Sequence, residues 1–259
     1  MKKLFILTAL VLFVLSLRSQ EKEIYSKMNF IRGTDTLRYR LLYPLNYNPK
    51  KKYPVVLFLH GAGERGSDNE IQLTHGSKLF TDSLNRAKYP AFVIFPQCPV
   101  NEFWARVSFD RNKQPVQLEF ASNEPMTRPL TMVSALMDSF ATSGKVDKKK
   151  IYIGGLSMGG MGTFDMLWRK PGFFAAAFPI CGGGDSTKPA IYGKKFPIWV
   201  FHGADDPVVN VNHSRRMVAA LEAAKAKVKY TEYPGVKHDS WNNAFAEPEL
   251  MSWLFSQHK

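Results

Sequence analysis

The most informative part of this sequence is Ile151-Tyr152-Ile153-Gly154-Gly155-Leu156-Ser157-Met158-Gly159-Gly160. Its first three residues predict a buried strand, and the apolar residues of 158–168 recur at helical spacing. Between them, Gly155 to Gly159 fit the pattern G-x-S-x-G, a serine on a sharp strand-to-helix turn. Glycines on both sides of the serine let strand and helix approach closely. The pattern therefore predicts Ser157 as a nucleophile at a helix N-terminus, where an oxyanion is stabilised.

Short apolar runs recur on both sides of this stretch, at residues 55–59, 92–95, 151–153, 175–180, 198–201 and 229–233. Such runs are typical of strands that are buried on both faces of a parallel sheet. Between them, apolar residues at helical spacing predict helices at 130–140, 158–168, 214–224 and 248–255. Residues 24–31 and 36–43 predict an antiparallel pair. We therefore expect an α/β protein with a mostly parallel, doubly wound sheet and an antiparallel N-terminal strand pair.

The N-terminus has the pattern of a secretory signal peptide. Lys2 and Lys3 precede an apolar run at 4–15, which is too short to remain as a membrane span, and polar residues follow. We expect a signal peptide at 1–20 and one domain at 21–259, exported to the periplasm or outside and without a stable membrane anchor after cleavage. A buried N-terminal helix is the alternative.

Charge and cysteine usage add smaller expectations. The formal net charge is +13, with lysine runs at 50–52 and 148–150 before predicted strands. We interpret them as solvated turn residues; a surface for an acidic polymer is the alternative. No aromatic residues interleave with the lysines, so nucleic acid is not an expected partner. Cys98 and Cys181 follow strands that are not neighbours in the expected sheet, which predicts two free thiols.

One segment has neither strand nor helix periodicity. Residues 97–125 are irregular but contain four aromatic side chains, Phe103, Trp104, Phe109 and Phe120. Loops of this length in a compact domain are usually functional. This one leaves the carboxyl end of a strand, where open α/β sheets bind ligands.

A base and an acid follow Ser157 in the order that this turn requires. His238 lies on the last loop before the final helix, where it can take the serine proton and return it to the leaving group. For the acid, Asp206 follows the strand at 198–201 and is our choice over its neighbour Asp205. Asp239 adjoins His238 and is the weakest candidate, because consecutive side chains seldom face each other.

Two backbone N–H groups are expected to hold the oxyanion. One is that of Met158, directly after the nucleophile, and the other is that of Ala62, in the loop after the strand at 55–59. The small residues of this loop allow its amides to approach a substrate. The remaining histidines lack any metal-ligand spacing, so we expect neither a metal nor another cofactor.

Five blocks of sequence resemble one known family. They are Leu59 to Gly66, Pro96 to Pro99, Gly155 to Gly159, His202 to Val208 and His238 to Trp241. The chain resembles α/β-hydrolase esterases often labelled predicted peptidase or phospholipase/carboxylesterase, close to bacterial feruloyl and acetylxylan esterases. The resemblance implies Ser157, Asp206 and His238 as a catalytic triad. It also implies that Gln97, Trp104 and Trp241 lie near the substrate, although a buried indole often simply fills space.

Three functions follow from these residues. The first is an exported serine carboxylic-ester hydrolase that acts through an acyl-enzyme, on a small-molecule ester or on acetyl or feruloyl esters of plant polysaccharide. The second is a serine peptidase of the prolyl-oligopeptidase-like group, whose large additional domain has no room in this chain. The third is a binding protein without catalysis, against which the complete set of Ser157, Asp206 and His238 argues.

Overall fold

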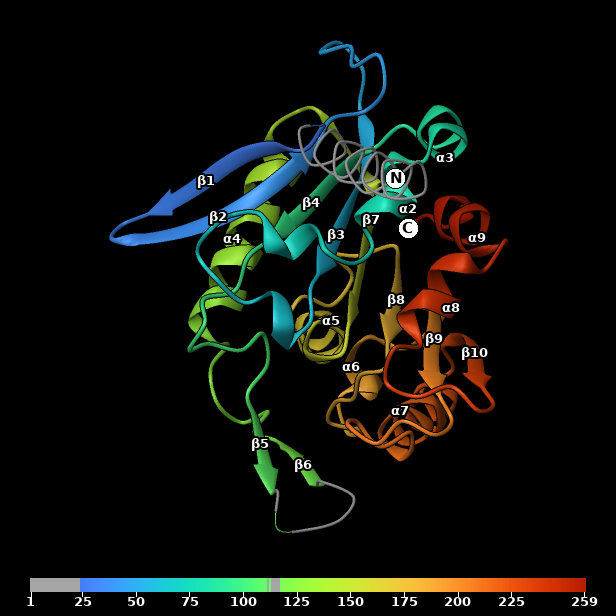
Figure 1. Ribbon diagram of the computed structural model, residues 1–259. Coiled ribbons are helices and arrows are strands. Elements are labelled where there is room, and N and C mark those ends of the chain that lie inside the picture. The colour runs from blue at the N-terminus through green and yellow to red at the C-terminus, as the bar shows by residue number, and fades with distance from the viewer. Residues whose placement is uncertain (1–23, 111, 113–116) are drawn as a thin grey trace, which may run out of the picture.

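The computed structural model describes residues 24–110, 112 and 117–259, and an eight-stranded sheet runs through its centre (Figure 1). Across the sheet the strands are β1 (Ser26–Arg32), β2 (Asp35–Leu42), β4 (Phe92–Pro96), β3 (Tyr53–Leu59), β7 (Val146–Leu156), β8 (Ala176–Ile180), β9 (Pro197–Gly203) and β10 (Lys227–Tyr233). β2 is antiparallel to β1 and β4, and all other neighbours are parallel. The expected sheet is confirmed, and the predicted signal peptide lies outside the described residues.

The middle of the sheet is buried on both faces. All residues of β4 and β8 are buried, and so are Val55 to Leu59 of β3. These are the continuous apolar runs of the sequence, whose alternate side chains enter two separate hydrophobic clusters. Burial on both faces requires cover on both faces.

Helices supply that cover. One face packs against α4 (Arg128–Thr142), α5 (Met158–Arg169), α6 (Pro189–Tyr192) and α7 (Asn212–Ala223). The other packs against α2 (Ser77–Thr81), α8 (Trp241–Ala246) and α9 (Leu250–Ser256), with α3 (Ser83–Lys88) directly after α2. The four helices expected from apolar spacing are α4, α5, α7 and α9, so these predictions are confirmed. Two short 3-10 turns, η1 (Ala62–Glu64) and η2 (Ile71–Leu73), follow β3.

Two parts of the chain differ from the expectation. The segment 97–125 contains an antiparallel hairpin of β5 (Val107–Asp110) and β6 (Gln117–Phe120), which projects from the body of the molecule in Figure 1. The lysine run at 148–150 lies inside β7, which begins at Val146 because that residue pairs with Tyr53 before a register shift. That run is therefore not a turn.

The cysteines agree with the prediction. Cys98 and Cys181 are free thiols, and both are buried. They follow β4 and β8, which are separated in the sheet by β3 and β7. Over the described residues, the structure contains no helix with the length and apolarity of a membrane span.

Candidate active site

Ser157 lies on the turn between β7 and α5, and its backbone has a strained conformation. Its φ is 52° and its ψ is −116°, a region that side chains with a Cβ rarely adopt. The Ser157 N–H donates to the Ile180 carbonyl (2.9 Å), which ties the turn to β8. A Cβ on Gly159 would stand 1.9 Å from the Leu59 oxygen, so the helix can approach β3 only because this residue is glycine. This is the geometry that the sequence pattern predicts.

His238 reaches the serine from the loop after β10. Its Nε2 lies 3.0 Å from Ser157 Oγ, within hydrogen-bond distance. The loop passes close over the end of β9, where a Cβ on Gly203 would meet the Lys237 oxygen at 2.2 Å. The Asp205 N–H donates to the Val236 carbonyl (3.0 Å), and this bond holds the loop after β10 against the loop after β9. The loop after the edge strand β10 thus places His238 beside Ser157.

Asp206 lies beneath the histidine. Its Oδ2 lies 2.7 Å from His238 Nδ1, and its Oδ1 accepts the N–H groups of Val208 (2.8 Å) and Val209 (2.9 Å). A carboxylate can only accept here, so Nδ1 carries the proton and Nε2 is free to receive one from Ser157. Asp205 and Asp239 are both exposed. The structure brings together the three residues that the sequence selects.

A second histidine bonds to the same carboxylate, and the sequence reasoning missed it. His202 Nε2 lies 2.8 Å from the Val209 carbonyl and 3.2 Å from Asp206 Oδ2, so this nitrogen carries a proton. Its Nδ1 lies 2.7 Å from Ser214 Oγ. The separation of four residues between His202 and Asp206, on the turn that leaves a strand, is the only signal in the sequence that points to this contact.

The hydrogen bonds decide the charge of Asp206. Burial raises the pKa of this carboxyl, but the bonds from His202 and His238 outweigh burial. The resulting pKa lies well below the usual range of an aspartic acid. Asp206 therefore stays ionised at lower pH than an ordinary aspartic acid does, and in that form it can stabilise an imidazolium on His238.

Two backbone amides are available beside Ser157. Among the described residues, neither the Met158 N–H nor the Ala62 N–H has a backbone acceptor. Met158 begins α5, and Ala62 follows the end of β3, which pairs with β7 at Leu59 and Gly155. The parallel register therefore brings both loops to the same edge of the sheet, as the expected oxyanion hole requires.

The residues expected near the substrate separate into two groups. Trp104 has no exposed surface, and its indole N–H donates to the His60 carbonyl (3.0 Å). Gln97 is also buried, and its side-chain amide bonds to Asp68 and to the Asn69 N–H. Both side chains are buried and bond to neighbouring loops, and their place near a substrate stays a prediction.

Trp241 does border the site. Its ring stands edge-on to His238 with centroids 5.4 Å apart, and it lies 5.1 Å from the ring of His75. Its indole nitrogen is buried and has no hydrogen-bond partner among the described residues. Of the three residues that the resemblance implies, only Trp241 therefore contacts the catalytic histidine.

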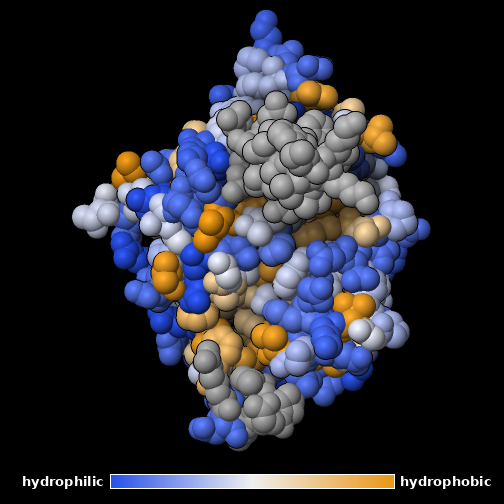
Figure 2. Space-filling model, viewed as in Figure 1, coloured by the Kyte–Doolittle hydropathy of each residue, from blue (hydrophilic) through white to orange (hydrophobic). Residues whose placement is uncertain are grey.

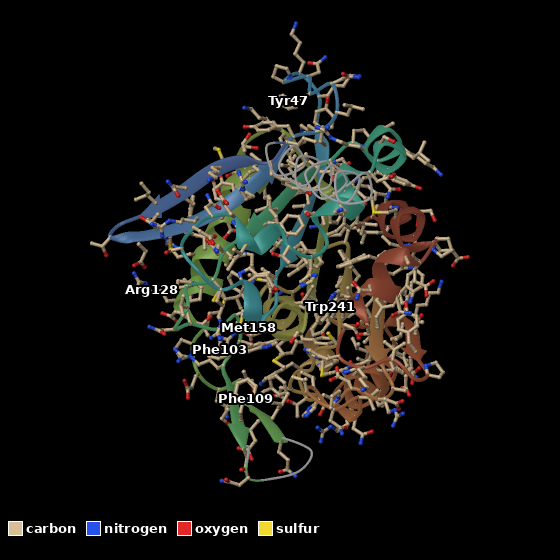
Figure 3. All side chains as sticks on the ribbon, in the orientation of Figure 1. Tyr47, Phe103, Phe109, Arg128, Met158 and Trp241 are labelled. Carbon is tan, nitrogen blue, oxygen red and sulfur yellow. The ribbon has the colours of Figure 1, made fainter. Side chains whose placement is uncertain are left out.

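An apolar wall lies on the hairpin side of the site. The rings of Phe103 and Phe109 lie 5.8 Å apart, and the guanidinium of Arg65 lies 4.7 Å from the centre of the Phe103 ring. Figure 3 places Phe103 close to Met158 and Phe109 farther away, on β5 of the hairpin. Figure 2 shows apolar residues gathered on this face above the hairpin. Phe109 is 38% exposed, so an aromatic or acyl group can contact it.

One group of side chains has the composition of a metal site. Ligand atoms of Cys181, Asp206 and His238 lie within 4.8 Å of one another. Asp206 and His238 are already bonded to each other, and burial raises the pKa of the Cys181 thiol, which therefore keeps its proton. A protonated thiol is a poor metal ligand, so these three side chains do not fit a metal ion.

Comparison with known proteins gives a family. Residues 46–249 match the family model described as Phospholipase/Carboxylesterase. The chain is 26% identical over 211 residues to "Carboxylesterase SOBER1" of Arabidopsis thaliana, covering 77% of this chain and 88% of the relative. It is 25% identical over 241 residues to "Acyl-protein thioesterase 1" of Cryptococcus neoformans, covering 81% of this chain and 95% of the relative.

Solved structures agree. A thermostable esterase superposes with a TM-score of 0.82 at 37% identity, covering 93% of this chain and 64% of the other, so this chain spans about two thirds of that protein's length. A ferulic acid esterase superposes with a TM-score of 0.63 at 15% identity, covering 90% of this chain and 98% of the other, a likeness in fold alone. The chain belongs to the phospholipase/carboxylesterase family of α/β-hydrolases and is a serine hydrolase.

Proposed function

We propose that this protein is a carboxylic-ester hydrolase that acts through an acyl-enzyme on Ser157. One observation carries the proposal: Ser157, His238 and Asp206 form an unbroken chain of hydrogen bonds of 3.0 and 2.7 Å. Asp206 fixes the His238 tautomer, and the unprotonated Nε2 of His238 faces the serine oxygen. His238 can therefore act as the base and Ser157 as the nucleophile in the positions that they already have.

The reaction follows from these positions. His238 Nε2 takes the proton of Ser157 Oγ as the oxygen attacks the ester carbonyl carbon, and the N–H groups of Met158 and Ala62 stabilise the oxyanion. His238 then gives the proton to the alcohol oxygen as the C–O bond breaks. A water attacks the acyl-serine, loses its proton to His238 and releases the acid. Ser157 recovers the proton, and the enzyme is unchanged.

Acetyl or feruloyl esters of plant polysaccharide are the proposed substrates. The apolar wall of Phe103 and Phe109 offers an aromatic surface beside the site, of the kind that packs against a phenyl ring. A ferulic acid esterase shares the fold, which is consistent with this choice. Trp241, on the other side of His238, is the proposed substrate-binding residue there.

We also propose that the protein is exported. The support is the sequence of residues 1–20, with two lysines, an apolar run and a polar exit. Expression of the full chain, separation of the cell fractions and N-terminal sequencing of the product provide the test. Export with cleavage near residue 20 is expected, and a variant without residues 2–20 serves as the control that stays inside. A full-length product retained in the cytoplasm refutes export.

Activity is tested with a panel of substrates and one variant. Nitrophenyl acetate and butyrate, methyl ferulate, acetylated xylan, an acyl thioester and a chromogenic peptide amide are compared on wild type and Ser157→Ala. We expect ester cleavage in the wild type and a loss of more than about 10³-fold in the variant. Faster cleavage of the peptide amide than of any ester supports a peptidase instead. A folded wild type that does not react with a fluorophosphonate at Ser157 contradicts catalysis.

A further inference from the structure

His60 is a buried histidine outside the hydrogen-bonded triad, and both of its ring nitrogens have backbone partners. Its Nδ1 lies 2.7 Å from the Gly61 carbonyl oxygen, and its Nε2 lies 2.9 Å from the Cys98 nitrogen. A carbonyl can only accept and an N–H can only donate, so Nδ1 carries the proton and Nε2 accepts. Burial lowers the pKa of His60 to about 4, and the ring is neutral at ordinary pH.

The Gly61 carbonyl accepts the His60 Nδ1–H at 2.7 Å and the Glu64 N–H at 3.4 Å, and the shorter bond, from His60, sets the direction of the next amide. The Gly61 carbonyl and the Ala62 N–H belong to one planar trans peptide and point in opposite directions. A bond that holds the carbonyl toward the His60 ring therefore aims the Ala62 N–H away from that ring. This N–H has no backbone acceptor among the described residues, and Ala62 is exposed.

This peptide lies against the turn that carries the nucleophile. A Cβ on Gly61 would stand 2.7 Å from Leu156 Cδ1, one residue before Ser157. A Cβ on Gly159 would stand 2.7 Å from the His60 carbonyl oxygen. The loop after β3 and the turn after β7 are thus in direct contact, and a rotation of the Gly61 peptide would move a hydrogen-bond donor beside Ser157.

His60 also joins this loop to the end of β4. The Cys98 N–H that bonds Nε2 belongs to the residue pair directly after that strand. The Trp104 indole N–H donates to the His60 carbonyl (3.0 Å), and the two rings meet edge-on at 5.1 Å. The ring thus has fixed supports on one side and the Gly61 carbonyl on the other.

We propose that His60 is a positioning residue for ester cleavage, whose Nδ1–H holds the Gly61 carbonyl so that the Ala62 N–H faces the oxyanion. The inference rests on the proposed function, since the oxyanion forms only when Ser157 attacks an ester. If His60 only filled space, catalysis would not depend on which of its ring nitrogens carries the proton. A positioning role requires a hydrogen-bond donor at the position of Nδ1, whereas a packing role does not, and this difference can be tested.

Two amide side chains divide the histidine's roles. Asparagine carries its amide nitrogen at the distance of Nδ1 from the backbone, so His60→Asn keeps a donor for Gly61 and loses the acceptor for Cys98. Glutamine carries its amide at the distance of Nε2, so His60→Gln keeps the acceptor for Cys98 and loses the donor for Gly61. Both variants lose the ring, which makes each the matched control of the other for packing.

The test compares kcat, KM and thermal midpoint for wild type and both variants with a nitrophenyl ester. We expect kcat of His60→Asn within about threefold of wild type and kcat of His60→Gln lower by about 30-fold or more, with KM nearly constant. The affinity for phenylboronic acid, whose adduct with Ser157 places an oxygen in the oxyanion hole, should fall in parallel with kcat. The two thermal midpoints should be similar.

Equal losses of kcat in the two variants, a loss that resides in KM, or a loss that follows the thermal midpoint would overturn the proposal. Nitrogen-15 NMR of the wild-type ring gives a measurement that does not depend on either variant folding. We expect the Nδ1–H tautomer of His60 from pH 6 to 8, and the Nε2–H tautomer would overturn the proposal. A wild type that cleaves no ester in the panel marks the failure of the proposed function itself, and it overturns both.

Discussion

His202 Nε2 lies 3.2 Å from Oδ2 of Asp206, and neither side chain has exposed surface. The same oxygen accepts the N–H of His238, while the other oxygen accepts two backbone N–H groups. Four donors thus surround one carboxylate. This arrangement fixes the orientation of Asp206 and lowers the pKa of its carboxyl, so His238 faces an ionised partner at neutral pH.

Replacement of His202 should weaken the fold more than the reaction. His202→Phe keeps the ring volume and removes both nitrogens, which leaves the Val209 carbonyl without its donor. We expect a loss of about 2–3 kcal/mol in the free energy of unfolding and about a tenfold loss in kcat, since Asp206 still accepts from His238. Urea unfolding and nitrophenyl ester kinetics provide the measurement. Ser214→Ala, which removes one partner of His202, should cost about 1 kcal/mol; an equal cost for both variants would contradict this reasoning.

Replacement of Asp206 should have the opposite balance. In Asp206→Asn the side-chain amide can turn a donor toward His238 Nδ1 and favour the other tautomer, in which Nε2 carries the proton and cannot act as a base. We expect kcat to fall by about 10³–10⁴-fold. Asp205→Asn is the matched control, because Asp205 is exposed, and its kcat should stay within about twofold of wild type. Comparable losses in the two variants would be incompatible with Asp206 as the acid.

Two glycines offer a test of the close contact between α5 and β3. A Cβ on Gly159 would stand 1.9 Å from the Leu59 oxygen, whereas a Cβ on Gly63 would meet nothing within 4 Å. Gly159→Ala should destabilise the protein by more than about 3 kcal/mol or prevent folding, because two backbones would have to separate. Gly63→Ala should change the thermal midpoint by less than about 2 °C. A stable Gly159→Ala protein would show that the contact is less tight than described.

Stability should fall in mild acid. Burial lowers the pKa of His60 to about 4, whereas a histidine in the unfolded chain has a pKa of about 6.5. As the pH falls from about 6.5 to about 4, the unfolded state binds the proton before the folded state does. The contribution of His60 to the free energy of unfolding is therefore complete above about pH 6.5 and is lost toward about pH 4. The loss from His60 reaches about 3 kcal/mol and then levels off. His213, whose pKa burial also lowers to about 4, acts in the same direction.

Urea unfolding at pH values from 7.5 to 3.5 measures this dependence. The slope should be smaller in His60→Asn, because that variant has one group fewer that changes its protonation on unfolding. An unchanged slope in the variant would mean that His60 is not the group responsible.

The sequence predicts what depends on local pattern. Ser157 lies in a five-residue motif, and Asp206 and His238 follow strands in chain order, so topology alone brings the three together. A short hairpin within an irregular segment is harder to predict. β5 and β6 have four residues each and pair only with each other, and a run this short leaves no periodic signal.

The role of a polar side chain is harder still. His60 and His202 act through backbone groups such as the N–H of Cys98 and the carbonyl of Val209, and no residue type marks a backbone partner. For Trp104, a wholly buried and an exposed indole look alike in a sequence, so only the fold shows that this one supports a loop.

The projecting hairpin has a consequence of a different kind. The groups that break the ester come from loops after β3, β7, β9 and β10, whereas β5 and β6 pair with each other outside the main sheet. The catalytic triad and the hairpin thus lie on separate parts of the sheet topology. Substitutions in β5 and β6 leave the strand pairing that positions Ser157, Asp206 and His238 unchanged, so the surface of the hairpin can diverge between relatives while the triad stays the same.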